Sequence, residues 1–276
     1  MSKNVDKREE YKMRIGFIGC GNMGQAMMSG MLSSGKVNKS DMIVSDKILS
    51  SRENVQKKFD VEVTEENVEV AKTSDVIFLA VKPQFYEDVI DEIKDVLEEN
   101  KILISIAPGK TLAWLEEKVG KQIKIVRAMP NTPAMVQEGM TGICGNGLVS
   151  ADEFDFVCNL FNSFSKAEIV PEHLMDVVTA VSGSSPAYVF MFIEAMADAA
   201  VEGGMPRAQA YTFAAQAVLG SAKMVLETQM HPGQLKDMVC SPAGTTIQAV
   251  RVLEEKGMRG AVMDAMKACL DKSRNM

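Results

Sequence analysis

Residues 14–24 read RIGFIGCGNMG, a short apolar run followed directly by glycines in the pattern G-x-G-x-x-G. Such a run is typical of a strand, turn and helix that bind a dinucleotide. The glycines permit a tight turn, let a pyrophosphate approach the backbone, and allow the helix to pack closely on the strand. Three glycines alone occur in many loops, so the position between a predicted strand and a predicted helix carries the argument.

Short apolar runs alternate with amphipathic runs as far as residue 170. The predicted strands cover 14–18, 42–45, 76–81, 102–106, 123–128, 141–144 and 168–170. The clearest predicted helices cover 22–33, 85–99, 111–119 and 152–164. Strands that are apolar on both faces and alternate with helices predict an α/β fold, a doubly wound parallel sheet of the Rossmann type.

The pattern changes after Pro171, where the strand-like runs stop. Residues 186–201 are apolar on almost every side of a predicted helix, and such a helix must be buried all round. A small domain cannot surround it alone, so we expect a subunit partner. Further helices are predicted at 206–227, from the His231-Pro232-Gly233 segment to Val239, and at 245–255. The predicted organisation is a polar N-terminal extension (1–12), a dinucleotide-binding domain (13–170) and an all-α domain (171–276).

Composition excludes several classes of partner. The net charge of −7 disfavours nucleic acid. The five cysteines form no C-x-x-C pair and there are only two histidines, so no metal site is expected. Residues 1–12 lack the apolar core of a signal peptide, and the apolar run Val189–Ile193 is cut short by Glu194. We expect a cytoplasmic protein with a small-molecule substrate and no membrane partner.

Ligands of an open α/β sheet bind beyond the carboxyl ends of its strands. The second predicted strand ends in Ser45, and three later ones end in 80–83 (AVKP), 105–109 (SIAPG) and 129–133 (MPNTP). Proline and glycine terminate strands in any protein, but here they share an edge with the glycine-rich loop. The predicted cofactor contacts are Ile18, Gly19, Gly21, Asn22, Met23, Gly24, Ser45, Ala80, Val81, Lys82, Pro83, Ser105, Ile106, Ala107 and Asn131.

Asp46 lies 46 − 24 = 22 residues beyond the last glycine of the pattern. An acid there accepts hydrogen bonds from the ribose hydroxyls of NADH and repels the extra phosphate of NADPH. Ser45, Lys47 and Arg52 are close in sequence and could neutralise that phosphate. Both NADPH and NADH therefore stay open as cofactors.

Residues 241–246 (SPAGTT) precede the predicted helix at 245–255. A loop of small residues that leads into a helix offers backbone N–H groups suited to a carboxylate. Thr246 adds a hydroxyl, although a threonine here also fits a helix cap. His231, beside Pro232, is expected to cap or pack. A substrate already activated as a protonated C=N bond would need only a placed hydride and a modest hydrogen-bonding partner.

The motifs together resemble those of the Δ1-pyrroline-5-carboxylate reductase family. They are 18–24 (IGCGNMG), 80–83 (AVKP), 127–133 (RAMPNTP), 231–236 (HPGQLK) and 241–246 (SPAGTT), and the resemblance extends over about residues 13–273. It implies hydride transfer from NAD(P)H to the C=N carbon of the cyclic imine, which gives L-proline in the last step of proline biosynthesis. It also implies homodimers intertwined through the helical domain, often in a ring of five dimers (a decamer).

The same resemblance implies roles for individual residues. Thr246 would hydrogen-bond the ring nitrogen and Lys82 would lie near the nicotinamide and substrate, which makes them the expected catalytic residues. Substrate binding is expected from Ser241, Gly244, Thr245, Thr246 and Gln229.

The chain departs from the family pattern at three positions. Gln229 stands where some relatives carry Glu, and Asp46 replaces the common Asn. Ala243 stands at a usual glycine, so a positive φ there would strain the loop by roughly a kcal/mol or more.

Three other functions were weighed. A β-hydroxyacid dehydrogenase would carry a lysine in the first long helix of its second domain, yet no Lys or Arg occurs between Lys166 and Arg207. A dinucleotide-sensing regulator would not need the SPAGTT loop. A reductase of a six-membered cyclic imine acid, or of an imine without a carboxylate, would keep the same chemistry.

Overall fold

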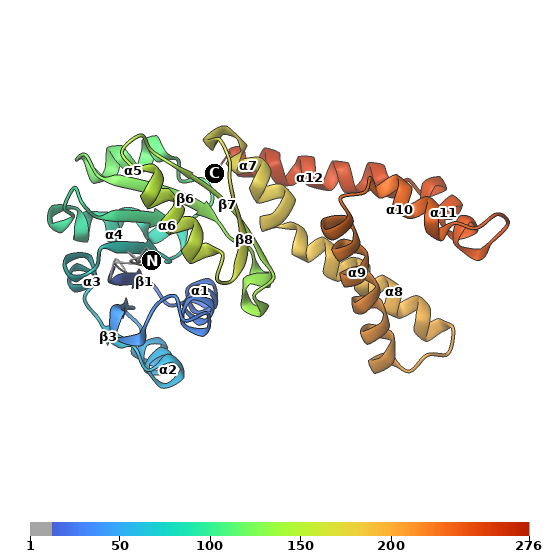
Figure 1. The fold of residues 1–276 in the computed structure, drawn as a ribbon, viewed down its shortest axis with the longest axis horizontal. Helices are drawn as coiled ribbons and strands as arrows, with labels where there is room; N and C mark the ends of the chain where they lie inside the picture. Colours follow the sequence, from blue (N-terminus) through green and yellow to red (C-terminus); the bar gives the residue numbers. More distant parts are fainter. Residues whose placement is uncertain (1–12, 276) are drawn as a thin grey trace, which may run out of the picture. The chain divides into compact units, whose positions relative to one another are not determined.

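The computed structural model describes residues 13–275, so the predicted extension 1–12 lies outside the described residues. The chain forms two compact units (Figure 1). The first ends at Gly183 and takes in the chain's last residues from Lys272, and the second covers Ser184–Asp271. The first unit ends 183 − 170 = 13 residues beyond the predicted domain boundary, because Met175 packs into its core and Ala180 is buried too.

The first unit is built on an eight-stranded sheet with the order β3-β2-β1-β4-β5-β6-β7-β8. The strands are β1 (Ile15–Ile18), β2 (Met42–Ser45), β3 (Glu62–Thr64), β4 (Val76–Leu79), β5 (Ile102–Ser105), β6 (Lys124–Met129), β7 (Gly139–Gly145) and β8 (Ser165–Ile169). Strands β1 to β6 are parallel, as predicted, while β7 pairs antiparallel with β6 and β8 parallel with β7. The strand order reverses between β1 and β4, which is the ligand-binding position of doubly wound folds.

Helices cover both faces of this sheet. They are α1 (Asn22–Ser33), α2 (Leu49–Phe59), α3 (Asn67–Thr73), α4 (Tyr86–Ile93), α5 (Leu112–Val119), α6 (Ala151–Phe161) and α7 (Met175–Val178). Single turns of 3-10 helix lie at Lys39–Asp41, Pro83–Phe85, Lys94–Val96, Thr132–Val136 and Glu172–Leu174, and a π-helical turn lies at Thr179–Gly183.

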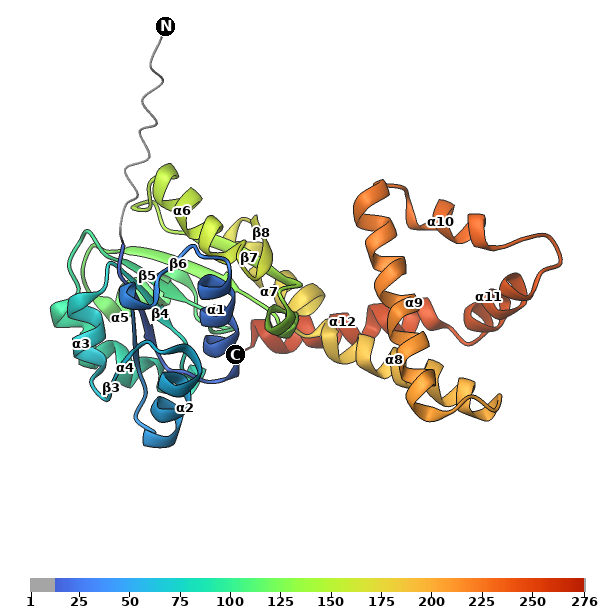
Figure 2. The ribbon, with the colours of Figure 1, turned by 60° about the horizontal axis from the view of Figure 1, so that its bottom comes forward.

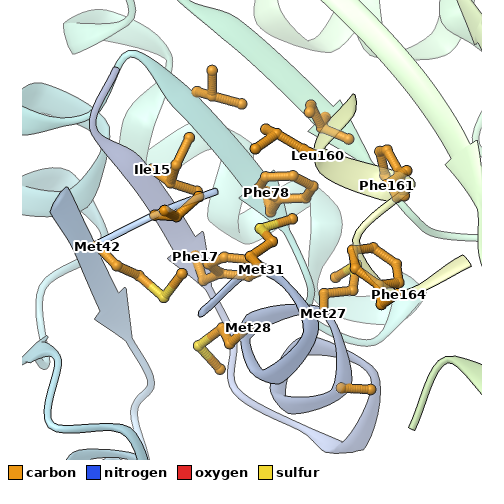
Figure 3. Close-up of a cluster of buried hydrophobic side chains, with 14 of the residues drawn as sticks. Ile15, Phe17, Met27, Met28, Met31, Met42, Phe78, Leu160, Phe161 and Phe164 are labelled. Atoms are coloured by element: carbon orange, nitrogen blue, oxygen red, sulfur yellow. The ribbon is translucent and has the colours of Figure 1, made fainter. Parts of the chain in front are cut away.

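Two apolar clusters hold these layers together, one on each face. Helices α1, α2 and α6 contribute to the first, in which Met31 of α1 lies against Phe17 and Phe78 of the sheet (Figure 3). The rings of Phe17 and Phe78 stack with their centroids 4.6 Å apart. Helices α3, α4 and α5 pack on the opposite face. The methionines of α1 are core filler, as unbranched side chains that fit irregular gaps.

The predicted elements need four kinds of correction. The chain adds α2, β3, α3 and a last helix, α12 (Met258–Arg274), which were not predicted. The predicted helix 85–99 is shorter, because α4 ends at Ile93 and a 3-10 turn follows. The predicted helix 152–164 begins earlier and ends at Phe161, where the chain turns into β8. The sheet is not parallel throughout, since β7 runs back along β6.

The second unit contains only helices among the described residues. They are α8 (Ser185–Glu202), α9 (Arg207–Thr228), α10 (Pro232–Val239), α11 (Thr245–Glu255) and most of α12. Helices α8 and α9 pack against each other (Figure 2) through small residues, with Ala197, Ala210 and Ala214 buried. Large apolar side chains stay on the outside: Phe190 of α8 is 62% exposed and Phe213 of α9 is 65% exposed. An exposed apolar surface of this kind marks an interaction site.

One helical run, Glu172–Glu202, is long and apolar enough to cross a membrane by length and composition. Its mean hydropathy reaches 1.2 in the most apolar window, of which 11% is buried. The apolar run Val189–Ile193, which Glu194 interrupts, lies within this helical run. Glu194 and Asp198 are exposed on α8, and carboxylates are expensive inside a bilayer.

A buried phenol ties together the carboxyl ends of two central strands. Tyr86 Oη donates to the carbonyl of Leu79, at the end of β4, over 2.6 Å. It accepts from the N–H of Ile106, just beyond β5, over 3.2 Å, and lies 3.3 Å from Ser105 Oγ. Burial raises the pKa of Tyr86 to about 12, so its hydroxyl stays protonated and able to donate.

We predict that Tyr86→Phe lowers the free energy of unfolding by about 1–3 kcal/mol, because it leaves two buried backbone groups without a partner. The loss should be present at neutral pH and should shrink as the pH rises past about 10, where the unfolded tyrosine ionises while the folded one resists. Urea unfolding at neutral pH and above about pH 10 measures this loss of stability. The control is Tyr211→Phe, which removes a half-exposed hydroxyl from α9. Equal losses of stability in the two variants would contradict the conclusion that the Tyr86 hydroxyl joins the ends of β4 and β5.

Candidate active site

The glycine-rich loop sits where β1 meets its two neighbours. The N–H of Gly19 donates to Ser45 O of β2 over 2.8 Å, and the N–H of Ala80 after β4 donates to Ile18 O over 2.8 Å. Gly19 has φ +96°, and a Cβ there would lie 2.8 Å from the carbonyl carbon of Ala80. Only glycine satisfies both constraints.

Helix α1 begins at the end of this loop with an open N-terminus. Gly21 is the N-cap residue and gives no side-chain cap, and the first turn contains no acidic residue. No hydrogen bond is recorded from the N–H groups of Asn22, Met23 or Gly24. A Cβ on Gly21 would meet nothing within 4 Å, so the space beside Gly21 at the start of the helix is open. Free N–H groups at a helix N-terminus bind phosphate.

The two other predicted residues of this motif, Ile18 and Gly24, allow the loop to pack on the core. Ile18 is fully buried in the core beneath it. A Cβ on Gly24 would come within 3.0 Å of Gly19 O, so that glycine allows the helix to pack closely on the strand, as predicted. Gln25 braces the loop, since its Nε2 donates to Cys20 O over 2.9 Å.

Asp46 follows β2 and holds the glycine-rich loop through its carboxylate. Its Oδ2 accepts from the N–H of Cys20 over 3.0 Å and lies 3.2 Å from Cys20 Sγ. Its Oδ1 accepts from the N–H of Ile48 over 2.9 Å. Burial, with the charge and hydrogen bond of Asp46, raises the pKa of Cys20 to about 12, so this thiol is an unreactive donor.

Ser45 needs a correction as a predicted cofactor contact. Its side chain is fully buried, and Oγ donates to Asn67 Oδ1 over 2.8 Å. Ser105 is likewise buried, with Oγ beside Tyr86 Oη. Neither hydroxyl is available to a ligand, because side chains alternate between the faces of a strand and both of these point into the protein. Contacts through the backbone of these residues stay a prediction.

Asn131 also differs from the expectation. Its Nδ2 donates to Ser182 O over 3.0 Å and its Oδ1 accepts from the N–H of Met140 over 2.8 Å. The residue is only 8% exposed. Its amide ties the loop after β6 to β7 and to the turn at 182, so its side chain has a structural role in this arrangement.

The segment after β4 presents the most accessible of the predicted groups. Ala80 and Val81 are half-buried beside Gly19, and Pro83 opens a 3-10 turn. Lys82 is exposed, and its ammonium has no recorded ion pair. Ile106 and Ala107 follow the end of β5, with Ile106 half-buried and Ala107 nearly buried. The described residues thus place a free cation near the carboxyl ends of β1 and β4.

In the second unit, residues 241–244 form a tight turn before α11. The N–H of Gly244 donates to Ser241 O over 3.0 Å, and a Cβ on Gly244 would lie 2.3 Å from Ser241 Oγ. Ala243 has φ +57°. Proline at the second position and a positive φ at the third are features of a type II turn, in which glycine is preferred at the third position. The positive φ on which the expected strain depends is confirmed.

Thr246 does not cap α11. Gly244 is the N-cap and no side chain bonds to the first turn. Thr246 is half-buried and Thr245 exposed, and no hydrogen bond is recorded for either hydroxyl. The loop therefore joins two unbonded hydroxyls to the free N–H groups of a helix N-terminus, an arrangement that suits a small anion with a hydrogen-bonding ring.

Gln229 and His231 have local roles in the structure. Gln229 ends α9 with φ +56°, and its Nε2 donates to Leu226 O over 2.6 Å. His231 Nδ1 accepts from the N–H of Gly233 over 3.0 Å, so this histidine caps α10, as predicted. No recorded contact joins Gln229 to residues 241–246.

The sequence analysis did not predict two side-chain interactions in the first unit, one made by Tyr86 and one by Asp46. Tyr86 looked like one apolar position of an amphipathic helix, and nothing in the pattern indicates that its hydroxyl joins two strands. The bond between Asp46 and the N–H of Cys20 was also missed, although the distance of Asp46 from the last glycine had already marked it as important.

The glycine-rich loop fits a dinucleotide by its own geometry. Gly19 admits the close turn, Gly21 leaves open space, and the first turn of α1 offers unbonded N–H groups to a pyrophosphate. These features, all found among the described residues, are the ones that binding of the predicted dinucleotide requires.

Known proteins match both parts of the chain. A family model described as pyrroline-5-carboxylate reductase dimerisation matches residues 172–276. One described as NADP oxidoreductase, coenzyme F420-dependent, matches residues 14–109. These ranges agree with a cofactor-binding first part and a second part built for association.

Full-length relatives share one name. The pyrroline-5-carboxylate reductase of Escherichia coli is 54% identical over 95% of this chain and 98% of its own length. The solved Coxiella burnetii enzyme of that name is 35% identical, with a TM-score of 0.89 over 96% of this chain and 98% of its own. The Plasmodium falciparum pyrroline carboxylate reductase, solved with NADP bound, is 35% identical, with a TM-score of 0.87 over 95% and 97%. The chain belongs to the pyrroline-5-carboxylate reductase family.

Proposed function

We propose that this chain reduces the C=N bond of Δ1-pyrroline-5-carboxylate to give L-proline, with NAD(P)H as the reductant. The observation that carries the proposal is the loop 241–246, in which the hydroxyls of Ser241, Thr245 and Thr246 and the N–H groups of Thr245 and Thr246 have no recorded partner, in a chain 54% identical to a named reductase. The nicotinamide supplies a hydride for the ring carbon of the C=N bond. The ring nitrogen keeps its proton and becomes the secondary amine of proline.

The first unit binds the cofactor in this proposal. The N–H groups of Asn22, Met23 and Gly24 hold the pyrophosphate, with Gly19 and Gly21 giving it access. The segment from Ala80 to Pro83 and the turn at 106–107 hold the nicotinamide end through backbone groups. Lys82 contributes a positive charge at the nicotinamide end of the cofactor site.

The second unit binds the imine. Ser241 and Thr245 donate hydrogen bonds to its carboxylate, and Gly244 can join them only by giving up the bond from its N–H to Ser241 O. Thr246 holds the ring nitrogen through its hydroxyl. Gln229 would reach the substrate only by giving up its bond to Leu226 O, so we assign it the weakest role of this group.

The exposed apolar side chains of α8 and α9 indicate a homodimer, and we propose a ring of five dimers as the complete assembly. A partner subunit covers this surface better than lipid would, because Asp198 forms an ion pair with Arg207 on the same surface and Glu194 is also exposed. All five cysteines are free, which supports a reducing, cytoplasmic location. The acidic net charge supports the absence of a nucleic-acid partner. We also propose residues 1–12, 13–170 and 171–276 as the extension, cofactor domain and substrate and dimerisation domain.

A parallel assay tests the function. NADH and NADPH oxidation is followed with Δ1-pyrroline-5-carboxylate, with a six-membered cyclic imine acid, and with an imine that lacks the carboxylate. Rapid oxidation with the five-membered acid supports the proposal. Faster turnover of either other imine would change the substrate, and no oxidation while the cofactor binds would favour the dinucleotide-sensing regulator.

Gly21→Val should abolish cofactor binding without loss of fold. The side chain would enter the free space that a pyrophosphate needs, and losing two hydrogen bonds to an anion weakens binding by about a hundredfold or more. Cofactor titration and thermal melting measure the two properties. Gly147→Val is the matched control, since a Cβ there also meets nothing within 4 Å, in a turn remote from the loop. Normal affinity in Gly21→Val would reject the site.

Thr246→Ala should lower kcat by about tenfold to a thousandfold, as expected for the loss of one hydrogen bond that stabilises the transition state. Its melting temperature and its NAD(P)H affinity should stay near those of the parent, because the hydroxyl caps no helix. Thr246→Ser should restore most of the rate, and Thr212→Ala on α9 is the control. Loss of stability and of cofactor binding in Thr246→Ala would show that the threonine is structural.

Ala243→Gly should raise the free energy of unfolding by roughly 0.5–1 kcal/mol, because glycine adopts a positive φ without strain. Ala249→Gly, in the middle of α11, is the opposite-signed control and should cost about 1 kcal/mol. Urea unfolding of both variants at one protein concentration measures the contrast. A comparable loss in both would mean that the turn at 243 is not strained.

A further inference from the structure

The carboxylate of Asp46 is fixed in place by the backbone on two sides. One oxygen accepts from the N–H of Cys20 in the glycine-rich loop, and the other accepts from the N–H of Ile48 in the loop after β2. Both distances are close to 3 Å, and the residue is half-buried. Asp46 therefore cannot swing away from the rim of the cofactor site without breaking the contacts that shape the loop.

This rim is where the adenosine ribose of a dinucleotide lies in a doubly wound fold, at the carboxyl end of the second strand. A carboxylate has about four acceptor positions, and the two backbone N–H groups and the Cys20 thiol use three of them. Acceptor capacity remains for a ribose hydroxyl. A 2′-phosphate at the same place would bring its own negative charge against a carboxylate that cannot move.

The cations near this rim are already paired. Lys47 Nζ lies 3.4 Å from Glu92 Oε1. Arg52 donates to Asp46 O over 2.6 Å and to Glu65 Oε2 over 3.1 Å, and its side chain is only 13% exposed. Arg52 is thus committed to the backbone and to an acid. Neither cation is free to neutralise a phosphate.

The hydroxyl of Ser45, the remaining group that could bind a phosphate at this rim, points into the protein. Ser45 donates to Asn67 in the interior, and Asn67 in turn donates to Glu92. The acids Asp46, Glu65 and Glu92 outnumber the two bases around this rim. Its electrostatic character opposes a 2′-phosphate.

We propose that this chain prefers NADH to NADPH and that Asp46 is the residue that determines the preference. The proposal rests on the proposed function, because it concerns the cofactor of that reaction. It assigns Asp46 two tasks with different partners: the backbone bonds shape the glycine-rich loop, and the remaining acceptor capacity of the same carboxylate selects a free ribose hydroxyl.

The first test is equilibrium binding by the unaltered full-length protein. NADH and NADPH are titrated by nicotinamide fluorescence, and 5′-AMP and 2′,5′-ADP are compared by calorimetry as fragments that differ only in the phosphate. We expect NADH to bind at least about tenfold more tightly than NADPH, and 5′-AMP more tightly than 2′,5′-ADP. Added salt should narrow both ratios, since it screens the repulsion. NADPH binding as tight as or tighter than NADH at low salt would overturn the proposal.

The second test removes the negative charge of the Asp46 side chain. Asp46→Asn and Asp46→Ser should each shift the NADH-to-NADPH affinity ratio by about tenfold or more towards NADPH. The ratio is the informative quantity, because damage to the loop weakens both cofactors alike and leaves their ratio unchanged. Glu99→Gln removes an exposed negative charge ahead of β5, at the opposite end of that strand, and should leave the ratio unchanged. An unchanged ratio in both Asp46 variants would show that another group makes the selection.

The imine assay separates this proposal from the function itself. If NADH binds more tightly and the Asp46 variants shift the ratio, but no imine is reduced with either cofactor, the cofactor preference stands and the proposed reaction fails. If Δ1-pyrroline-5-carboxylate is reduced equally well with both cofactors and their affinities are equal, the reaction stands and the preference fails.

Discussion

The contact between Gly19 and the backbone of Ala80 is the constraint on which the first unit depends. Strand β1 must leave the sheet beside β4 and turn at once into α1, in a space that admits no side chain. The same turn brings the open N-terminus of α1 to the point where the strand order reverses. One backbone requirement therefore determines both the packing of α1 on the sheet and the place where an anion binds.

Much of this unit follows from pattern alone, for a physical reason. The central strands are buried on both faces, so their residues are continuously apolar and easily recognised. Strand β3 escaped recognition because it is a three-residue edge strand that begins with the exposed Glu62. The reversed direction of β7 was also beyond prediction, since side-chain periodicity is the same in parallel and antiparallel strands.

Only some features of the candidate site could be predicted from the sequence. Glycine positions could be predicted because they report backbone geometry, and Ala243 shows that a departure from glycine also carries information. Side-chain contacts could not, because the end of a strand does not reveal which face a residue takes. Ser45 and Asn131 stand at the right strand ends, yet both are bonded inside the protein. The family resemblance, rather than periodicity, supplied the roles of Thr246 and Lys82.

The second unit depends on association in a way that the first does not. Its helices pack through alanines and leave phenylalanine, methionine and leucine outside, so the surface is complete only with a partner. The loop 241–246, which the proposed function assigns to the substrate, belongs to the same unit.

The most direct test of the reaction is to follow the hydride itself. NADH deuterated at both hydrogens of nicotinamide C4 is supplied with Δ1-pyrroline-5-carboxylate, and the product is analysed by mass spectrometry and NMR. We expect L-proline with a single deuterium on the ring carbon that formed the C=N bond. Unlabelled proline, or deuterium at another carbon, would contradict it.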